Sequence, residues 1–218
     1  MNEISWQTLR NDYAEGGLVE FDLAPDPLVQ LRRWLTEAHD AGLSQPNALV
    51  LATADATGAP SVRMLLLKGI EPDGLLIYTN YESRKARELA ENPQCALVFP
   101  WHPLERQVRI DGEARRADAQ TSDGYFASRP RGAQLGAWAS PQSAVVPDRA
   151  ALESAYDEAS SRWPEPEPVP RPPHWGGYVV RPHVVEFWQG RPGRMHDRLR
   201  YRRTPDADTG WTIERLAP

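Results

Sequence analysis

The sequence contains very little cysteine and no long apolar run. Cys95 is the single cysteine among 218 residues, which excludes an intramolecular disulfide and suits a reducing compartment. No apolar run approaches the roughly 20 residues that a membrane-spanning helix needs. Residues 1–6 lack the basic and apolar regions of a secretion signal. These absences predict a cytoplasmic protein with no membrane partner, and the apolar run 95–99 predicts that Cys95 is a buried structural thiol.

An overall positive charge is also lacking. The chain has 25 basic and 30 acidic residues, a formal net charge of −5, so the field used by nonspecific nucleic-acid binders is absent and no nucleic-acid partner is expected. The sequence has no G-x-G-x-x-G fingerprint, no P-loop and no G-x-S-x-G motif, and its five histidines lack metal-site spacing. Any phosphate must therefore be bound by another route, and no metal is expected.

Hydrophobic periodicity predicts a mainly β protein with some helices. We expect residues 1–24 to form a flexible arm and residues 25–218 a single domain. The strands are short, closely spaced and joined by tight turns, which is typical of an antiparallel barrel with helices packed outside. Expected helices are 27–42, 84–91, 118–128 and 148–162, and expected strands are 48–54, 61–69, 75–79, 95–101, 107–115, 177–181, 184–189, 194–201 and 211–216.

One predicted hairpin concentrates positive charge. Two apolar runs flank the Gly/Pro loop 190–193, and side chains alternate between the two faces of a strand. The returning strand would then place Arg194, His196, Arg198 and Arg200 on one face, where like charges repel. This pattern indicates an anionic or electron-rich ligand, but a solvent-exposed edge strand explains it equally well.

The predicted helix at 84–91 begins with two cations. Ser83 is a suitable N-cap, and Arg84 and Lys85 occupy the first turn, where the helix dipole disfavours positive charge. A phosphate bound at this helix end would explain them, whereas the alternative is two solvated surface cations. Arg63 and Lys68 flank a neighbouring strand. Their spacing places them on opposite faces unless a bulge intervenes, so they could serve two different anions.

Two weaker patterns add to this picture. Arg129 follows Tyr125 at the end of the predicted helix 118–128, a combination that suits a phosphate, although a helix C-terminus also favours cations without any ligand. An aromatic side chain and several amide or hydroxyl groups could hold a flat heteroaromatic ring, although each is more often structural: Trp188, Gln107, Gln142 and Ser143.

Taken in order, several segments resemble one known family. They are Arg63–Lys68, Tyr78–Asn80, Ser83–Lys85, Phe99–His102, Leu104–Gln107, Ser128–Arg131, Gln134–Trp138, Glu186–Gly190 and Arg194–Arg198. Together they are similar to the pyridoxine/pyridoxamine 5′-phosphate oxidases, and the likeness runs from about Arg10 to Pro218.

The resemblance implies an FMN-binding split β-barrel that works as a homodimer, with two FMN sites at the subunit interface. It implies that FMN is bound by Arg63, Met64, Leu65, Leu66, Leu67, Lys68, Tyr78, Thr79, Arg84, Lys85, Gln107, Gln142, Ser143, Trp188 and Arg198, some of them from the other subunit. It further implies that the substrate phosphate contacts Lys68, Tyr125 and Arg129. The catalytic residues Arg194 and His196 would lie against the substrate ring, and Arg10 and Tyr13 would close over it.

The implied reaction is oxidation of pyridoxamine or pyridoxine 5′-phosphate to pyridoxal 5′-phosphate, with O2 reduced to H2O2. Two positions depart from the family pattern: Gln45 stands where an acidic residue is common, and Ala133 where some members carry a serine at the substrate phosphate. These departures leave two alternatives open. One is a flavoenzyme of the same fold with another substrate, such as a phenazine precursor, and the other is a non-catalytic protein that binds FMN or pyridoxal phosphate.

Overall fold

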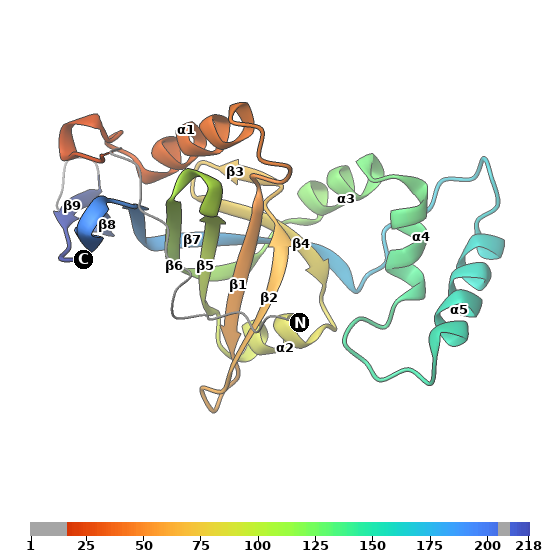
Figure 1. The fold of residues 1–218 in the computed structure, drawn as a ribbon. Helices are drawn as coiled ribbons and strands as arrows, with labels where there is room; N and C mark the ends of the chain where they lie inside the picture. Colours follow the sequence, from red (N-terminus) through yellow and green to blue (C-terminus); the bar gives the residue numbers. More distant parts are fainter. Residues whose placement is uncertain (1–16, 205–209) are drawn as a thin grey trace, which may run out of the picture. The chain divides into compact units, whose positions relative to one another are not determined.

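The fold is built on an antiparallel sheet. The computed structural model describes residues 17–204 and 210–218. Within these residues the strands follow the order β2-β1-β5-β6-β7-β4-β3, and β8 pairs with both β7 and β9. Their bounds are β1 Ala48–Ala54, β2 Pro60–Leu66, β3 Gly69–Glu71, β4 Gly74–Asn80, β5 Gln94–Trp101, β6 Arg106–Arg116, β7 Trp175–Gln189, β8 Asp197–Arg203 and β9 Trp211–Arg215. The expected mainly β architecture with helices is confirmed (Figure 1).

The chain divides into two compact units. The first contains the described parts of residues 1–48, 98–110 and 183–218, and the second contains residues 49–97 and 111–182. The strands β5, β6 and β7 each contribute residues to both units. The expectation of a flexible arm over 1–24 and a single domain over 25–218 stays a prediction.

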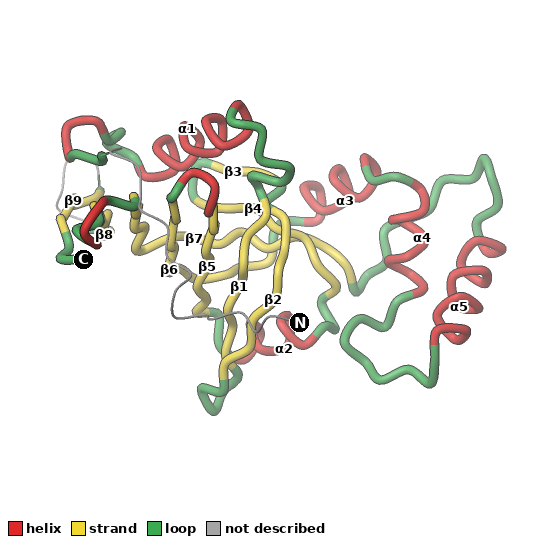
Figure 2. The backbone as a smooth tube through the Cα atoms, in the orientation of Figure 1, coloured by secondary structure: helices red, strands yellow, loops and turns green. Residues whose placement is uncertain are grey.

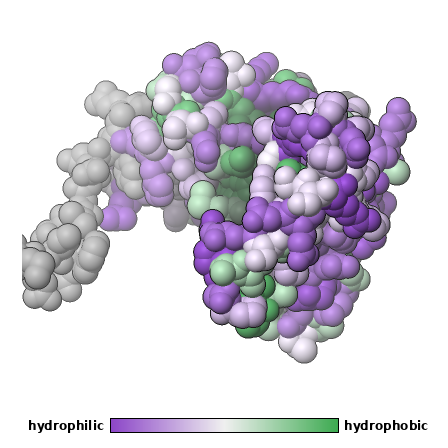
Figure 3. Space-filling model, turned by 90° about the vertical axis from the view of Figure 1, so that its right-hand side faces the viewer, coloured by the Kyte–Doolittle hydropathy of each residue, from purple (hydrophilic) through white to green (hydrophobic). Residues whose placement is uncertain are grey.

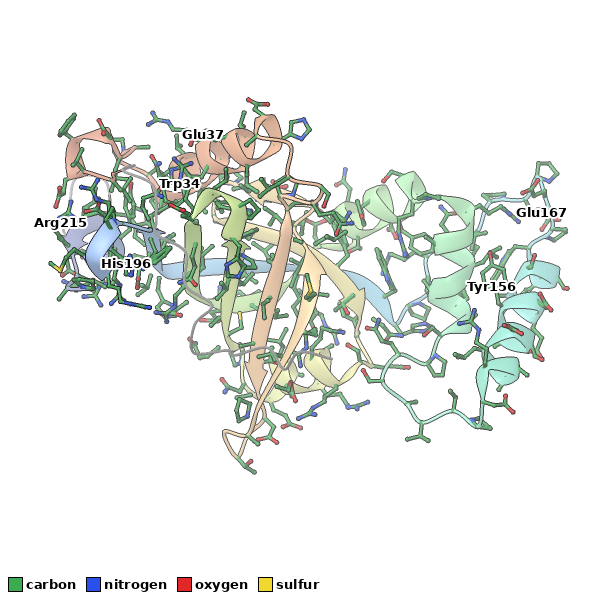
Figure 4. The ribbon with its side chains drawn as sticks, viewed as in Figure 1. Trp34, Glu37, Tyr156, Glu167, His196 and Arg215 are labelled. Atoms are coloured by element: carbon green, nitrogen blue, oxygen red, sulfur yellow. The ribbon has the colours of Figure 1, made fainter. Side chains whose placement is uncertain are left out.

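In the first unit, helix α1 (Pro27–Asp40) packs its apolar face against aromatic residues. The helix begins as expected, because the Asp26 side chain accepts hydrogen bonds from the backbone N–H of Leu28 and Val29 and Pro27 occupies the first turn. Trp34, on the inner side of α1 in Figure 4, meets Phe187 edge to face at 5.0 Å between ring centroids. The short 3₁₀ segments of this unit are η2 (Glu20–Asp22), η3 (His102–Leu104) and η4 (Pro192–Arg194).

In the second unit, β4 lies between β3 and β7. Tyr78 is paired with Gly177 and Asn80 with Trp175 in the antiparallel register of β4 and β7. Helix α2 (Arg84–Glu91) lies beside β1 and β2 (Figure 1). Glu88 of α2 accepts hydrogen bonds from Thr53 of β1 and Ser61 of β2, so this packing is partly polar.

Three further helices of the second unit share a small core. They are α3 (Ala119–Ser128), α4 (Arg131–Ala139) and α5 (Arg149–Arg162); a short turn joins α3 to α4, and a longer loop joins α4 to α5 (Figure 2). Their buried cluster contains Phe126, Leu135, Ala159, Val169 and Trp175. Tyr156 of α5 lies on the side of that helix that faces α4 in Figure 4. This agrees with the 3.2 Å that would separate its hydroxyl from a Cβ added at Gly132.

Several predicted elements were wrong in detail. The strand expected over 61–69 is interrupted, because β2 ends at Leu66 and the backbone N–H of Lys68 already bonds to Leu76 in the next ladder. The strands expected at 177–181 and 184–189 are one continuous strand, β7. Residues 129–132 end α3 as expected, but α4 begins at once at Arg131, directly after Pro130.

The expected strand over 194–201 begins three residues late. Arg194 ends η4 with a φ of 61°, and β8 starts only at Asp197. The prediction that Arg194 and His196 share one strand face is therefore wrong, because neither residue is in the strand. The expected alternation of side chains between the two faces holds further along β8, where Leu199 and Tyr201 are both buried. Among the described residues, no helix combines the length and apolar composition needed to cross a bilayer.

Candidate active site

A cavity of about 460 Å³ lies within the second unit. Its size falls in the range of small-molecule sites. The break between β2 and β3 contributes Lys68, β4 contributes Tyr78 and Thr79, and α3 and α4 contribute further lining residues. The lining residues are Leu65, Leu66, Lys68, Tyr78, Thr79, Asn80, Tyr125, Arg129, Ala133, Gly136, Ala137, Ser140, Gln142 and Trp175. Eight of these were predicted as site residues from the sequence.

Two cations of this cavity have no acidic partner among the described residues. Lys68 is exposed, and Arg129 is half-buried. The Nη1 atom of Arg129 is buried and has no hydrogen-bond acceptor in the described part of the chain. A buried charged donor without an acceptor is costly, and an anion would relieve that cost. Tyr125 adds a phenol to the same cavity, so the predicted contacts Lys68, Tyr125 and Arg129 are brought together.

Aromatic rings form one wall of the cavity. Tyr78 and Tyr125 are stacked, with ring centroids 3.9 Å apart and an interplanar angle of 17°. Burial raises the pKa of the Tyr78 phenol to about 12, and the neighbouring Tyr125 adds to the shift. Tyr78 therefore stays protonated near neutral pH, and it donates to the backbone oxygen of Thr121 at 3.3 Å.

A second polar group surrounds the buried carboxylate of Glu88. Arg63 donates to Thr53 Oγ1 at 2.6 Å and to Ser61 Oγ, and its Nη2 lies 3.3 Å from Glu88 Oε2. Arg84 reaches the other oxygen of Glu88, Oε1, at 2.8 Å. Burial alone would raise the pKa of Glu88, but hydrogen bonds from Ser61, Thr53 and Arg84 outweigh it and lower the pKa to about 2. The carboxylate is thus ionised and fixes both arginines.

Lys85 links this group to the cavity. Its ammonium donates to Gln142 Oε1 at 2.9 Å and to Thr79 Oγ1 at 3.1 Å, and both of these partners line the cavity. It also donates to Ser83 Oγ at 3.1 Å. Burial lowers the pKa of Lys85 to about 8, and the nearby charge of Arg63 contributes to the shift. A bound anion would favour the charged form of this side chain.

The N-terminus of α2 is left without a side-chain cap. Ser83 occupies the N-cap position as expected, but its hydroxyl donates to Asn80 O at 2.7 Å instead of accepting from the first turn. The prediction that the Ser83 side chain caps this helix is therefore wrong. The same hydroxyl oxygen accepts a hydrogen bond from the Lys85 ammonium at 3.1 Å. The backbone N–H of Ala86 donates to Ser83 O at 3.0 Å, so the N–H groups of Arg84 and Lys85 are the ones this turn offers to an anion.

The first unit holds the predicted residues of the β7–β8 hairpin. Arg198 donates to Glu186 Oε1 at 2.8 Å, and this hydrogen bond raises the pKa of the guanidinium. Arg200 is paired with Glu214 at 2.7 Å. The charges that the sequence placed in one row are therefore partly neutralised within the protein. Trp188 and His196 lie with ring centroids 4.7 Å apart.

The histidine of this hairpin has a defined proton position. The backbone N–H of Arg191 donates to His196 Nδ1 at 3.1 Å. A backbone N–H can only donate, so Nδ1 carries the lone pair and the neutral ring keeps its proton on Nε2. His196 is labelled in Figure 4.

The remaining predicted residues occupy varied positions. Met64 is 67% exposed on β2, whereas Leu67 is buried. Ser143 is exposed with a φ of 72°, and Gln107 of β6 is half-buried. Arg10 and Tyr13 lie outside the described residues.

Sequence reasoning missed the residues that support the site. Glu88, Thr53 and Ser61 anchor Arg63, and Trp175 lines the cavity beside Arg129. The four-residue spacing of Arg84 and Glu88 was a usable signal for an ion pair on one helix face. The other contacts join distant segments, and no local pattern indicates them.

Sequence models of known families cover most of the chain. Residues 35–162 match the family described as pyridoxamine 5′-phosphate oxidase, and residues 175–218 match the C-terminal dimerisation region of pyridoxine 5′-phosphate oxidase. A curated pyridoxine/pyridoxamine 5′-phosphate oxidase from a Nocardioides species is 59% identical over 218 residues, covering 100% of both chains. The chain belongs to this family. The resemblance stated from the sequence is confirmed.

Further relatives of the oxidase family agree in sequence and in structure. The Salinibacter ruber oxidase is 57% identical and covers 96% of this chain and 97% of its own. The crystal structure of PhzG from Burkholderia lata 383, in complex with tetrahydrophenazine-1-carboxylic acid, superimposes with a TM-score of 0.84 at 33% identity over 91% of this chain and 95% of that one. An FMN-binding, oxidase-related protein from Nostoc punctiforme has a TM-score of 0.70 at 20% identity, covering 90% of this chain and all of that one, which shows the fold alone. The predicted fold class is therefore confirmed, and membership of the oxidase family implies an oxidoreductase with a flavin cofactor.

Proposed function

We propose that this protein oxidises pyridoxamine 5′-phosphate and pyridoxine 5′-phosphate to pyridoxal 5′-phosphate, with FMN as cofactor and O2 as the final electron acceptor. The observation that carries the proposal is the unneutralised Arg129, with its orphaned Nη1, in a cavity that also contains Lys68 and Tyr125. A phosphate monoester accepts several charge-assisted hydrogen bonds and matches this set of donors.

A second set of donors fits the phosphate of FMN. Arg63, Arg84 and Lys85 gather around Glu88, Thr79 and Gln142, and the uncapped end of α2 adds backbone N–H groups. The carboxylate does not cancel this charge, because Glu88 pairs with Arg63 and Arg84 and supplies a single negative charge, whereas Lys85 is hydrogen-bonded to neutral groups. Both phosphates thus have candidate sites in one unit, which matches a cofactor and a substrate that are each phosphorylated.

FMN, when bound, supplies the ring that accepts hydride from the substrate C4′ carbon and then reacts with oxygen. The protein supplies position and charge. Arg198, fixed by Glu186, provides a cation suited to the electron-rich edge of a flavin. In this proposal His196, whose ring lies against Trp188, orients the substrate ring, and Arg194 in the adjoining turn adds a further cation.

We also propose that the protein acts as a homodimer, which the match to a dimerisation region supports. In this proposal Gln107, Ser143, Trp188 and Arg198 complete the flavin site, and Arg194 and His196 contact the substrate. Arg10 and Tyr13 close over the substrate.

The deciding experiment is anaerobic addition of pyridoxamine 5′-phosphate to the purified yellow protein. Bleaching of the flavin, followed by recovery of colour and release of H2O2 when air is admitted, is the expected result. Arg129→Leu should raise KM for this substrate strongly, because a charge-assisted contact to phosphate contributes about 1.5–3 kcal/mol. A flavin colour that the substrate leaves unchanged would instead indicate a protein that only binds FMN.

A second candidate function is supported by the similarity to PhzG. That protein was crystallised with tetrahydrophenazine-1-carboxylic acid, at 33% identity to this chain. The alternative is therefore oxidation of a reduced phenazine precursor. Such a ligand bears a carboxylate and no phosphate, so turnover of it that survives Arg129→Leu, without turnover of pyridoxamine 5′-phosphate, would favour the alternative.

A further inference from the structure

Arg129 is held by aromatic rings instead of by an acid. Its guanidinium carbon lies 4.6 Å from the centroid of the Trp175 ring and 5.7 Å from that of Phe126. Its side chain makes no hydrogen bond or ion pair with the described residues. Arg63, by contrast, is held by Glu88 and two hydroxyls. The two arginines are thus anchored by different chemistry.

An aromatic anchor has a specific consequence for anion binding. A cation over a ring face is attracted by the quadrupole of the ring, but its N–H donors are not used and its charge is not cancelled. A carboxylate in the same place would use the donors that a phosphate needs. The ring can therefore orient Arg129 without competing with a phosphorylated ligand.

The same indole orders a second predicted phosphate contact. The rings of Trp175 and Tyr125 are nearly parallel, with an interplanar angle of 9° and centroids 6.1 Å apart. Trp175 is also parallel to Tyr78, at 8° and 5.4 Å. Only 7% of Trp175 is exposed, and it is the first residue of β7, in register with Asn80 of β4. The sheet therefore fixes the ring against which both side chains are placed.

We propose that Trp175 is a positioning residue that gives the cavity its selectivity for phosphorylated substrates, by holding Arg129 and Tyr125 without neutralising the arginine. This inference rests on the proposed function, since it assigns the Arg129 cavity to the phosphate of the substrate. Trp175 does not take part in the chemistry at C4′. Its loss should affect phosphate recognition and leave the oxidation step intact.

The test compares the holoenzyme variants Trp175→Leu and Trp175→Phe with Trp138→Leu. Trp138 packs against the same core cluster and has a different arginine, Arg162, 5.3 Å from its ring centroid, so it controls for lost packing. Each variant is assayed with pyridoxamine 5′-phosphate and with unphosphorylated pyridoxamine. Calorimetry measures the binding of inorganic phosphate, and flavin content and thermal unfolding report on folding.

The expected result for Trp175→Leu is a KM for the phosphorylated substrate raised about tenfold with kcat within about twofold, and an unchanged kcat/KM for pyridoxamine. Trp175→Phe, which keeps a smaller ring face, should lie between this variant and the wild type and serves if the leucine variant fails to fold. Trp138→Leu should leave the preference for phosphate unchanged.

Equal losses on both substrates, or an unchanged affinity for phosphate, would overturn the role of Trp175 while the proposed function stood. A wild-type protein that binds phosphate but does not oxidise pyridoxamine 5′-phosphate would contradict the proposed function but not the role of Trp175. The inference would then be decided by the phosphate affinity of Trp175→Leu. A wild-type protein that does not bind phosphate would contradict both the proposed function and the role of Trp175.

Discussion

Glu88 and Arg63 form a partly buried ion pair with Nη2 and Oε2 3.3 Å apart, and they share the hydroxyls of Thr53 and Ser61. Glu88 is only 5% exposed. A buried charge of this kind is tolerated only while its partners are present. The pair therefore joins α2 to β1 and β2 and at the same time fixes a candidate phosphate-binding arginine.

Removing this carboxylate should be costly. Glu88→Ala leaves Arg63 without its acid, and we expect the free energy of unfolding to fall by roughly 3–5 kcal/mol. Urea unfolding measures the change, with the exposed Glu82→Gln as control. The pKa of Glu88 is lowered to about 2, so its contribution is present above its ordinary pKa of 4.5 and is lost as the pH falls from there toward 2. The free energy of unfolding of Glu88→Gln should therefore depend less on pH in this window than that of the wild type. An unchanged pH dependence in the variant would contradict the low pKa of Glu88.

The affinity for FMN should depend on pH through Lys85. Its pKa is lowered to about 8, so the ammonium loses its charge in the cofactor-free protein as the pH rises through 8. A phosphate monoester is already dianionic above pH 7, so its own titration adds nothing there. We expect FMN binding, measured by flavin fluorescence, to weaken by roughly 10-fold or more from pH 7 to 9.5, because a charge-assisted bond is lost.

The matched variant is Lys85→Arg, which stays charged throughout this range and should give a flat profile. Arg84→Ala combined with Lys85→Ala should release FMN altogether. Retention of flavin by that double variant would rule out a phosphate site at the start of α2.

Adding a hydroxyl group at Ala133 tests where the substrate phosphate binds. It lines the cavity that contains Lys68 and Arg129, and it has no hydrogen-bonding side chain. Ala133→Ser adds a donor, and we expect KM for pyridoxamine 5′-phosphate to fall roughly fivefold, equivalent to a net hydrogen bond of about 1 kcal/mol, with kcat unchanged. Ala127→Ser on the exposed side of α3 is the control. No effect on KM would place the substrate phosphate away from Ala133.

Arg194 should be needed for turnover and not for flavin retention. Its φ of 61° favours asparagine over leucine as a replacement, so Arg194→Asn tests the charge with less backbone strain. We expect most activity to be lost while the protein stays yellow, as judged by steady-state H2O2 release and the flavin spectrum. The exposed Arg181→Leu should keep full activity. An equally active Arg194→Asn would refute the role.

Cys95 should be inert in the folded protein. Burial raises the pKa of its thiol to about 12, and the charge of Asp111 adds to the shift. A thiol reagent at pH 8 should therefore label the protein only after unfolding in urea, and activity should survive the treatment. Rapid labelling of the folded, active protein would show that the thiol is accessible and reactive.

Local sequence determined the elements with strong end signals. Asp26 and Pro27 start α1, and the helix from Arg84 to Glu91 was predicted at its observed bounds, because the Asp26 cap of α1 and the Asn92-Pro93 stop of α2 act over a few residues. The cavity residues Lys68, Tyr125 and Arg129 were predicted together, but only from a whole-chain resemblance. Their separate patterns were weak.

Tertiary structure decided how the charges are used. Alternation along an ideal strand could not reveal that η4 takes Arg194 out of β8, or that Glu186 and Glu214 neutralise Arg198 and Arg200. Nor could it reveal that Trp175 lies under Arg129. Helix ends depend on neighbours a few residues away, so the sequence can specify them directly. Whether a cation faces an acid, a ring or an open cavity depends on contacts between different segments of the chain, such as Arg63 with Glu88, 25 positions apart, or on a turn that only the folded backbone sets.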